Sequence, residues 1–304
     1  MKIYVAGHRG MVGSAITRAI EADGKHSWIG AKRSELDLTE RQSVINFLRE
    51  NQPDAVIIAA AKVGGILAND SHPVDFLSKN LQIQTNLMDG SHEAQKENLI
   101  FLGSSCIYPK FAVQPIAESS LLTGALESTN EPYAIAKIAG VKLVEAYRKQ
   151  YGRKWTSLMP TNLYGPGDNY DPLNSHVIPG IIVKMCEAKK NNKESVTLWG
   201  TGSPLREFLY VEDLASATLF ALENYQGELA LNVGSGEEVS IRSLAEKIRT
   251  AVGFKGEIRW DDSKPDGTPR KLLDSSELAK LGWRPSVNLE EGLSKTIQEL
   301  PFHC

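Results

Sequence analysis

A pair of hydroxyl groups and a thiol follow directly on an apolar segment of the sequence. The segment Leu99–Leu102 is predicted as a buried parallel strand, and Ser104, Ser105 and Cys106 come immediately after it. Proteins built from alternating strands and helices bind ligands where their parallel strands end. The position therefore favours a site of chemistry, although the same small residues would also suit a simple loop out of the strand.

A tyrosine and a lysine lie four residues apart in a segment of helical periodicity. Tyr133 and Lys137 fall within a helix predicted from about Glu131 to Tyr151, so they share one helical face. A lysine ammonium beside a phenol favours the phenolate and lowers a pKa that starts at roughly 10. The tyrosine would then exchange protons more readily near neutral pH, and the Ser104 hydroxyl could hold the same substrate oxygen. Alone, the pair would equally suit an exposed helix surface.

Three glycines near the N-terminus indicate a second kind of site. A predicted strand, Lys2–Ala6, is followed by Gly7, Gly10 and Gly13 and then by apolar residues at helical spacing. Strand, glycine turn and helix form the opening of a dinucleotide-binding unit. The glycines allow a tight turn and close approach of a pyrophosphate, and the helix N-terminus offers it unpaired N–H groups.

The charges near the second predicted strand indicate which dinucleotide binds. A carboxylate that binds the ribose 2′-hydroxyl of NAD usually stands at the end of this strand. This chain has Arg33 there and Arg9 inside the glycine loop, and guanidinium groups suit a 2′-phosphate. The sequence therefore favours NADP(H), with NAD as the alternative if Glu35 or Asp37 occupies the strand end.

Repeated strand–helix units define the expected fold. They predict an α/β, Rossmann-type doubly wound parallel sheet with a smaller, discontinuous C-terminal α/β substrate domain. The NADP-binding domain is expected at 1–168 plus about 209–235. The sugar-nucleotide-binding domain is expected at about 169–208 plus 236–304. This second part begins where Pro166, Pro172 and Pro179 mark a loop-rich passage.

The composition narrows the partners of the chain. With 304 residues and a formal net charge of -3, it has no overall basic field that would attract nucleic acid or an anionic membrane. No apolar run approaches the roughly 20 residues that span a bilayer. The strand predicted directly after Met1 leaves no signal peptide, so we expect a cytoplasmic protein without a membrane or nucleic-acid partner.

The cysteines and histidines indicate neither disulfides nor a metal. Cys106, Cys186 and Cys304 form an odd and sparse set, which argues against a disulfide framework and suits a reducing compartment. Cys186 falls in an apolar helical pattern and is predicted to be core. The six histidines and three cysteines show no paired ligand spacing, so no metal site is expected.

Taken together, the glycine loop, Ser104 and Tyr133-x-x-x-Lys137 resemble those of an extended short-chain dehydrogenase/reductase. Longer stretches, among them AGHRGMVGSAI, GSSCIYPK, NEPYAIAKIAG, NSHVIP and KPDGTPRKLLD, are similar to those of the GDP-L-fucose synthase branch of this family. The similarity runs from Met1 to about Gly282. The combination of stretches is specific, whereas the glycine loop and the tyrosine–lysine pair alone would indicate only the wider family.

The resemblance implies a role for each matching position. It makes Ser104, Tyr133 and Lys137 a reductase triad and Cys106 and His176 an acid/base pair for epimerisation. Without the resemblance, Cys106 would be read as a small buried hydrophobe and His176 as a hydrogen-bonded loop residue. The implied cofactor residues are Gly7, Arg9, Gly10, Met11, Val12, Gly13, Arg33, Lys137, Asn162 and Leu163. The implied substrate residues are Lys184, Trp199, Arg206, Asp266 and Lys271.

The implied reaction is NADPH-dependent 3,5-epimerisation and 4-reduction of GDP-4-keto-6-deoxy-D-mannose to GDP-L-fucose, in a homodimer. Alternatives are the same chemistry on a related GDP-4-keto sugar, giving GDP-L-colitose or a GDP-heptose, and an NAD-retaining UDP-sugar 4-epimerase. The last requires neither a 2′-phosphate site nor Cys106. A redox-sensing NADP-binding protein without catalysis is a further alternative, against which the intact Ser104, Tyr133 and Lys137 argue.

Overall fold

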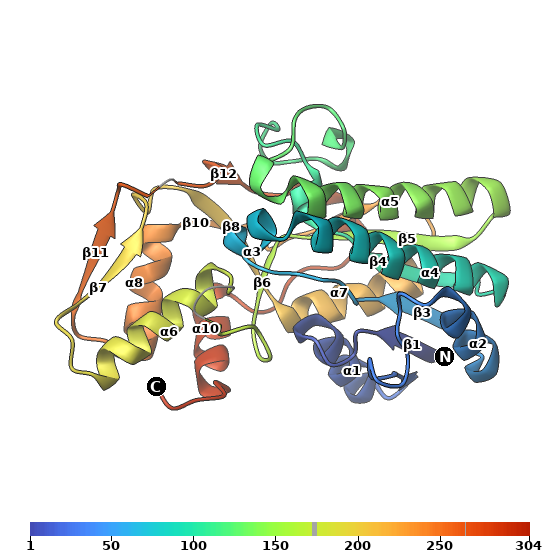
Figure 1. The fold of residues 1–304 in the computed structure, drawn as a ribbon, viewed down its shortest axis with the longest axis horizontal. Helices are drawn as coiled ribbons and strands as arrows, with labels where there is room; N and C mark the ends of the chain where they lie inside the picture. The colour runs from blue at the N-terminus through green and yellow to red at the C-terminus, as the bar shows by residue number, and fades with distance from the viewer. Residues whose placement is uncertain (172–174, 265) are drawn as a thin grey trace.

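The computed structural model describes residues 1–171, 175–264 and 266–304. Asn174 and Pro265, which belong to two of the quoted motifs, lie outside these residues. Six parallel strands form the main sheet in the order β2-β1-β3-β4-β5-β9 (Figure 1). Their bounds are β1 Lys2–Ala6, β2 Ser27–Ile29, β3 Ala55–Ile58, β4 Asn98–Leu102, β5 Lys154–Pro160 and β9 Leu231–Val233. The predicted Rossmann-type sheet is thus confirmed.

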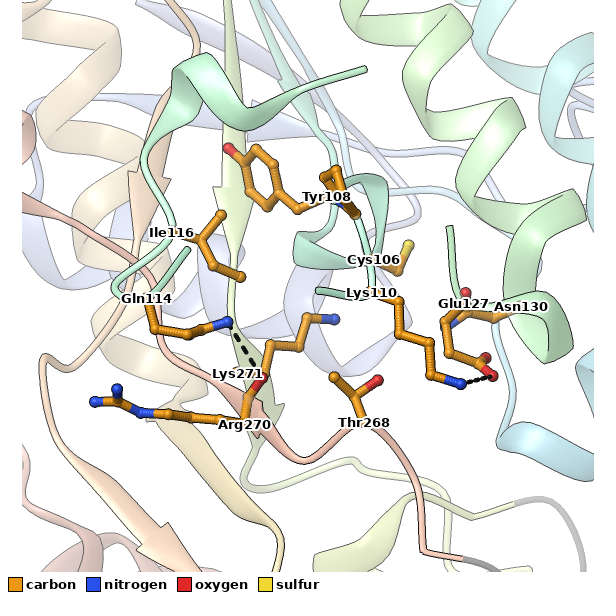
Figure 2. A pocket seen from close by; sticks show the side chains of 11 residues that line it. Cys106, Tyr108, Lys110, Gln114, Ile116, Glu127, Asn130, Thr268, Arg270 and Lys271 are labelled. Carbon is orange, nitrogen blue, oxygen red and sulfur yellow. Dashed lines mark hydrogen bonds and ion pairs between the residues drawn. The ribbon is translucent and has the colours of Figure 1, made fainter. Parts of the chain in front are cut away.

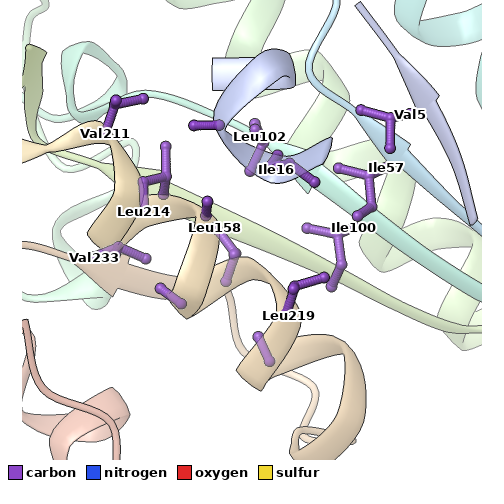
Figure 3. Close-up of a cluster of buried hydrophobic side chains, with 14 of the residues drawn as sticks. Val5, Ile16, Ile57, Ile100, Leu102, Leu158, Val211, Leu214, Leu219 and Val233 are labelled. Carbon is purple, nitrogen blue, oxygen red and sulfur yellow. The ribbon is translucent and has the colours of Figure 1, made fainter. Parts of the chain in front are cut away.

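The strands bury both of their faces because alternate side chains point to opposite sides of the sheet. In β1, Ile3 and Val5 enter one apolar cluster, which Figure 3 shows, while Tyr4 and Ala6 enter another. Helices cover the two faces. The first cluster packs against α1 (Met11–Asp23) and α7 (Val211–Asn224), and the second against α2 (Arg41–Asn51), α4 (Asn80–Glu93) and α5 (Glu131–Tyr151). This double covering makes the strands continuously apolar.

A second group of elements lies at the other end of the molecule in Figure 1. It packs around an apolar cluster of its own. Its mixed sheet joins β8 to β6, β10 and β12, and a separate parallel pair joins β7 to β11. The bounds are β6 Asn162–Tyr164, β7 Ser195–Trp199, β8 Leu205–Tyr210, β10 Glu238–Ser240, β11 Glu257–Asp261 and β12 Arg270–Lys271; the helices are α6 Val177–Lys190, α8 Ile241–Val252 and α10 Leu289–Gln298. The domain boundaries drawn from the sequence stay a prediction.

Short helices connect these elements. The remaining bounds are α3 Ile66–Ser71, η1 Asp75–Lys79, η2 Ser105–Ile107, η3 Glu118–Ser120, η4 Ser128–Asn130 and α9 Ser276–Lys280. Of these, η1 is a π-helical segment that runs directly into α4, and α4 ends at Glu93. Within the described ranges, no helix is both long and apolar enough to cross a membrane.

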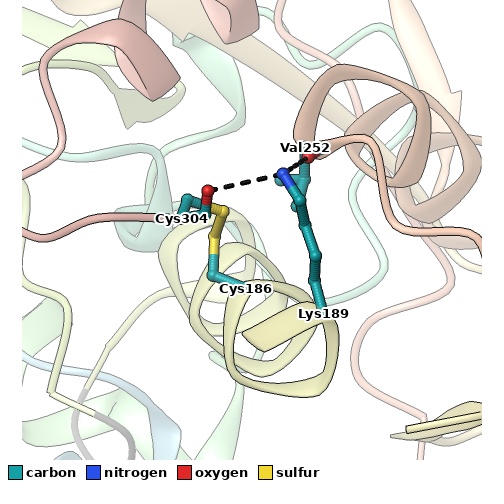
Figure 4. The surroundings of a disulfide bond; sticks show 4 residues. All are labelled: Cys186, Lys189, Val252 and Cys304. Atoms are coloured by element: carbon teal, nitrogen blue, oxygen red, sulfur yellow. Dashed lines mark hydrogen bonds between the residues drawn. A yellow bond between two sulfur atoms is a disulfide. The ribbon is translucent and has the colours of Figure 1, made fainter. Parts of the chain in front are cut away.

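One sequence-based expectation about the cysteines is wrong. Cys186 of α6 forms a disulfide with Cys304, 118 residues further along the chain (Figure 4). Lys189, one turn beyond Cys186, donates hydrogen bonds to the carbonyl oxygens of Val252 and Cys304, at 2.8 and 3.4 Å. The count of cysteines argued against such a bond, but the fold brings these two positions together. Cys106 is the free cysteine of the chain.

Candidate active site

The glycine loop between β1 and α1 forms a cradle with no room for side chains. Gly7 has φ +87°, which favours glycine, and a Cβ there would lie 2.7 Å from the Ala60 backbone nitrogen. A Cβ at Gly13 would collide with the Gly7 carbonyl oxygen. Gly10 is the N-cap residue, so the first N–H groups of α1 begin at this cradle. The loop therefore fits the pyrophosphate of a dinucleotide.

Basic residues lie around the loop next to β2. A Cβ at Gly30 would meet the His8 imidazole, whose buried Nδ1 has no hydrogen-bond partner. Burial and then the Arg9 guanidinium lower the pKa of His8. Arg9 and Arg33 are exposed, as a site for a phosphate dianion requires.

The two acids that could have bound the 2′-hydroxyl of NAD are engaged elsewhere. Glu35 accepts the Lys32 backbone N–H at 2.8 Å. Asp37 accepts the backbone N–H and the hydroxyl of Thr39 at 2.9 and 2.8 Å. Both carboxylates thus stabilise local turns, which favours NADP over NAD in this pocket.

The loop after β4 carries the hydroxyl and the thiol that the sequence analysis singled out. Ser104 is the N-cap of η2, and its Oγ accepts the Cys106 backbone N–H at 3.3 Å. Cys106 is only 8% exposed. Burial raises the pKa of its thiol, whereas Lys271, the Ser104 hydroxyl and Lys137 lower it, in that order. The thiol therefore lies beside a hydroxyl and two ammonium groups.

Tyr133 and Lys137 come from α5, whose first turn contains Pro132, and face this loop. The Lys137 ammonium donates to the Leu102 carbonyl oxygen, the last residue of β4, at 2.7 Å. It lies 4.8 Å from the centroid of the Phe101 ring and 5.8 Å from that of Tyr133. The predicted helical pairing thus meets the end of β4, next to Ser104.

The expected lowering of the Tyr133 pKa is wrong for this arrangement. Burial raises the pKa of the phenol, and the Cys106 thiol adds to the effect. Burial also lowers the pKa of Lys137 to about 8. The reason is geometric, because the ammonium is directed to the Leu102 carbonyl and both groups are removed from water.

His176 comes from a different element. It is the N-cap residue of α6, and although the residue is exposed overall, partial burial of the imidazole lowers its pKa. In the part of the chain that the structure describes, no hydrogen bond, ion pair or ring contact joins His176 to Ser104, Cys106, Tyr133 or Lys137. Its pairing with Cys106 stays a prediction.

The predicted substrate residues gather in the second group of elements. The Lys184 ammonium lies 5.5 Å from the Trp199 ring centroid, and Trp199 is 57% exposed, so this side chain is not core packing. Asp266 accepts the backbone N–H and hydroxyl of Thr201, at 3.0 and 2.7 Å. Burial lowers the pKa of Arg206, and nearby Asp266 raises it.

Two features of this region were missed by the sequence analysis. Lys264 lies 5.7 Å from the Trp199 ring centroid, which gives the indole a second cation. Lys271, predicted only as a substrate residue, is the strongest electrostatic influence on Cys106. Of the remaining predicted cofactor residues, Met11 and Val12 begin α1, and Asn162 and Leu163 lie in β6. Lys264 is the first residue of the quoted stretch KPDGTPRKLLD, but no local sequence signal places it beside Trp199 or links Lys271 to Cys106.

Fold and site together are those of a nucleotide-dependent oxidoreductase. The chain belongs to the NAD dependent epimerase/dehydratase family, which it matches over residues 3–234. It is 58% identical to GDP-L-fucose synthase 1 of Arabidopsis thaliana, over 97% of this chain and 91% of that protein. It is 51% identical to GDP-L-fucose synthase of Escherichia coli (strain K12), over 98% of this chain and 95% of that one.

A solved structure agrees with these relatives. A GDP-L-fucose synthetase from Naegleria fowleri bound to NADP superposes with a TM-score of 0.91 at 30% identity, covering 98% of this chain and 92% of that one. The resemblance inferred from the motifs is therefore confirmed over nearly the whole chain.

Proposed function

We propose that the chain catalyses the NADPH-dependent 3,5-epimerisation and 4-reduction of GDP-4-keto-6-deoxy-D-mannose to GDP-L-fucose. The observation that carries the proposal is the grouping of Ser104, Cys106, Tyr133 and Lys137 where β4 and α5 meet. It combines a reductase triad with a thiol in one place. The high identity to GDP-L-fucose synthases over almost the full chain supports this particular substrate.

The cofactor site is formed by the chain's own backbone and basic residues. The cradle between Gly7 and Gly13 would hold the pyrophosphate, and Arg9 and Arg33 would bind the 2′-phosphate through charge-assisted hydrogen bonds. Lys137, Asn162 and Leu163 would complete the pocket. When bound, NADPH supplies the hydride for C4.

In the reduction, Tyr133 donates the proton that the C4 oxygen requires, while Ser104 holds that oxygen. The Lys137 ammonium lies 5.8 Å from the Tyr133 ring centroid, and its positive charge offsets part of the cost of forming a phenolate in this buried place. The roles are thus divided between proton transfer by one residue and orientation by its neighbours.

In the epimerisation, the C4 ketone acidifies the protons at C3 and C5, and an enolate forms when either is removed. Cys106 and His176 form the acid/base pair on opposite faces of the sugar, because thiol and imidazole exchange protons near neutral pH. Ser104 and Tyr133 hold the enolate oxygen. One oxyanion site then serves both half-reactions. Lys184, Trp199, Arg206, Asp266 and Lys271 hold the GDP portion and the sugar.

The test is to incubate the purified protein with NADPH and GDP-4-keto-6-deoxy-D-mannose and to identify the product by NMR. Tyr133→Phe should suppress hydride transfer more than solvent deuterium exchange. Cys106→Ser should stop exchange at C3 and C5 but spare reduction of an already epimerised ketone. Folded protein that oxidises no NADPH contradicts the proposal, and full exchange in Cys106→Ser contradicts the role of the thiol.

The alternative substrate is a related GDP-4-keto sugar leading to GDP-L-colitose or a GDP-heptose. These sugars differ at C3 or C6, whereas the catalytic groups described above act on C4 and its neighbours. Comparing the rate of NADPH oxidation with each sugar at equal concentration distinguishes the candidates. Faster turnover of the 3,6-dideoxy or heptose substrate would replace GDP-L-fucose as the product.

Dimerisation and location complete the proposal. We propose a homodimer joined through α4 and α5, because family members form a four-helix bundle from these helices, and light scattering of the purified protein measures it. The cytoplasmic location is also a proposal. The Cys186–Cys304 disulfide removes the argument from unpaired cysteines.

A further inference from the structure

The Cys106 thiol and the Lys271 side chain line one small cavity beside the β4 loop (Figure 2). Glu127, Ile116 and Thr268 are among the other residues that line it. Cys106 is nearly buried, and Lys271 is the largest influence that counteracts the effect of burial on its thiol. Lys271, which belongs to β12 and lies far along the chain, therefore lines the same cavity as Cys106, the residue that removes protons in the proposed epimerisation.

The backbone of Lys271 is fixed on one side by Gln114. The Gln114 carboxamide donates to the Arg270 carbonyl oxygen at 3.2 Å and accepts the Leu272 N–H at 2.8 Å, so it brackets Lys271 (Figure 2). Next to it, the Ile116 N–H donates to the Leu272 carbonyl oxygen at 2.8 Å. The chain segment that follows Cys106 is thus bound directly to the segment that carries Lys271.

The other side of this segment is fixed by β8. Lys271 pairs with Arg206 in the parallel β12–β8 ladder. The buried Glu207 carboxylate accepts the N–H groups of Leu273 and Gly236, at 3.1 and 2.8 Å. The backbone that carries Lys271 is therefore held from both sides, which places its side chain in the wall of the cavity.

The charges around Lys271 distinguish it from its neighbours. Burial and then Arg206 of β8 lower its pKa, while Cys106 and Glu127 raise it. Among the cavity-lining cations that the structure describes, Lys110 lies 3.9 Å from Glu127, and Arg270 lies 2.7 Å from Glu238. From α5, Tyr133 and Lys137 face the thiol. Lys110 and Arg270 are thus paired with carboxylates, whereas the group that most raises the pKa of Lys271 is Cys106.

We propose that Lys271 is the electrostatic partner of Cys106 in epimerisation, and that Gln114 positions it. The inference rests on the proposed function. The thiolate sulfur accepts the proton from C3 or C5, and the C–H electron pair becomes the enolate whose oxygen Ser104 and Tyr133 hold. Lys271 keeps its proton and stabilises the thiolate before the transfer. In this role, which adds to its proposed contact with the sugar nucleotide, it is a positioning residue that acts through Cys106.

The first test titrates the thiol without substrate. Cys186 and Cys304 are disulfide-bonded, so iodoacetamide under non-reducing conditions labels Cys106, and Cys106→Ser serves as the blank. Loss of a neighbouring positive charge raises a thiol pKa by about one unit. Lys271→Met should therefore move the midpoint of alkylation rate against pH upward by about one unit, while Lys271→Arg, which keeps the charge, should leave it near the wild-type value.

Lys110→Met is the matched control, because it removes the same charge from the same cavity but from a lysine that lies beside Glu127. Its midpoint should equal that of the wild type. Gln114→Ala should shift the midpoint in the same direction as Lys271→Met, by less. Superimposable titrations of folded Lys271→Met and wild type overturn the pairing, as does an equal shift in Lys110→Met. No shift in Gln114→Ala overturns the positioning.

The second test measures solvent deuterium entry at C3 and C5. Lys271→Met should exchange about tenfold more slowly below the thiol midpoint, since a one-unit shift is a tenfold loss of thiolate, and should recover as the pH rises. Because Lys271 is also proposed to hold the sugar nucleotide, both reactions are measured at saturating substrate, where reduction of an already epimerised ketone should change less. Equal losses in exchange and reduction would overturn the proposal. A shifted alkylation midpoint with no reaction on the sugar would instead contradict the proposed function alone.

Discussion

Replacing Lys137 by methionine should stabilise the folded chain near neutral pH while abolishing reduction. Lys137 is 4% exposed, and burial lowers its pKa from 10.5 to about 8. At about 1.36 kcal/mol per pH unit, this difference means that folding disfavours the ammonium by about 3 kcal/mol. Methionine removes this cost but leaves the Leu102 carbonyl without its donor, which costs about 1–3 kcal/mol. The expected net gain is about 1 kcal/mol.

The gain should reverse with pH. Folded Lys137 loses its proton near pH 8, whereas the unfolded chain keeps it up to about 10.5. Between these values the unfolded chain binds more protons, so this residue makes the wild type more stable as the pH rises. The methionine variant lacks this contribution. The stability advantage of the methionine variant should therefore disappear at high pH. There the wild type, whose neutral lysine still donates to the Leu102 carbonyl, should be the more stable protein.

Urea unfolding of both proteins at about pH 7 and about pH 9.5 measures the effect. Lys142→Met is the control, because this lysine lies on the same helix, with its side chain 46% exposed and paired with Glu145, and should change stability little at either pH. A Lys137→Met protein less stable than wild type at neutral pH would refute the reasoning. So would a stability difference between the two proteins that does not vary with pH.

Three further changes test the cofactor site and the disulfide. Gly13→Ala should abolish NADPH binding in calorimetry because its methyl group would meet the Gly7 carbonyl, whereas Gly24→Ala, with nothing within 4 Å, should bind normally and lose about 1 kcal/mol of stability. An Arg9/Arg33 double alanine variant should lose its preference for NADPH over NADH; an unchanged ratio of kcat/KM values rejects the 2′-phosphate assignment. Cys304→Ser should lower Tm, since releasing a 118-residue loop returns about 5 kcal/mol of entropy to the unfolded chain. A dithiol should lower the Tm of the wild type only, and an equal drop in both proteins contradicts this.

The main sheet could be predicted because its signals are local. Ala55–Ile58, for example, is a short apolar run between helical patterns, and all four residues are buried in β3. The glycine loop is equally local, since strand, turn and helix lie within Lys2–Asp23. The pairing of Tyr133 and Lys137 on one helical face could also be predicted, because both residues belong to the same helix.

The remaining features depend on contacts between distant segments. The disulfide partner of Cys186 is set by where the chain after α10 returns, which no spacing encodes. Lys137 binds the Leu102 carbonyl because β4 ends there, opposite the second turn of α5. This contact, together with burial, reversed the expected effect on the Tyr133 pKa. The approach of Lys271 to Cys106 likewise requires β12 to pair with β8.

The place of β9 at the edge of the main sheet has a consequence for biosynthesis. Its residues, Leu231–Val233, pair with Leu158–Pro160 of β5, which is buried from Trp155 onward. A nascent chain that has emerged only as far as β8 therefore presents an unpaired apolar strand, the kind of edge that recruits other chains. The strand β5 gains its β9 partner only after α7 and β9 leave the ribosome, so pauses in translation between β5 and β9 should favour aggregation.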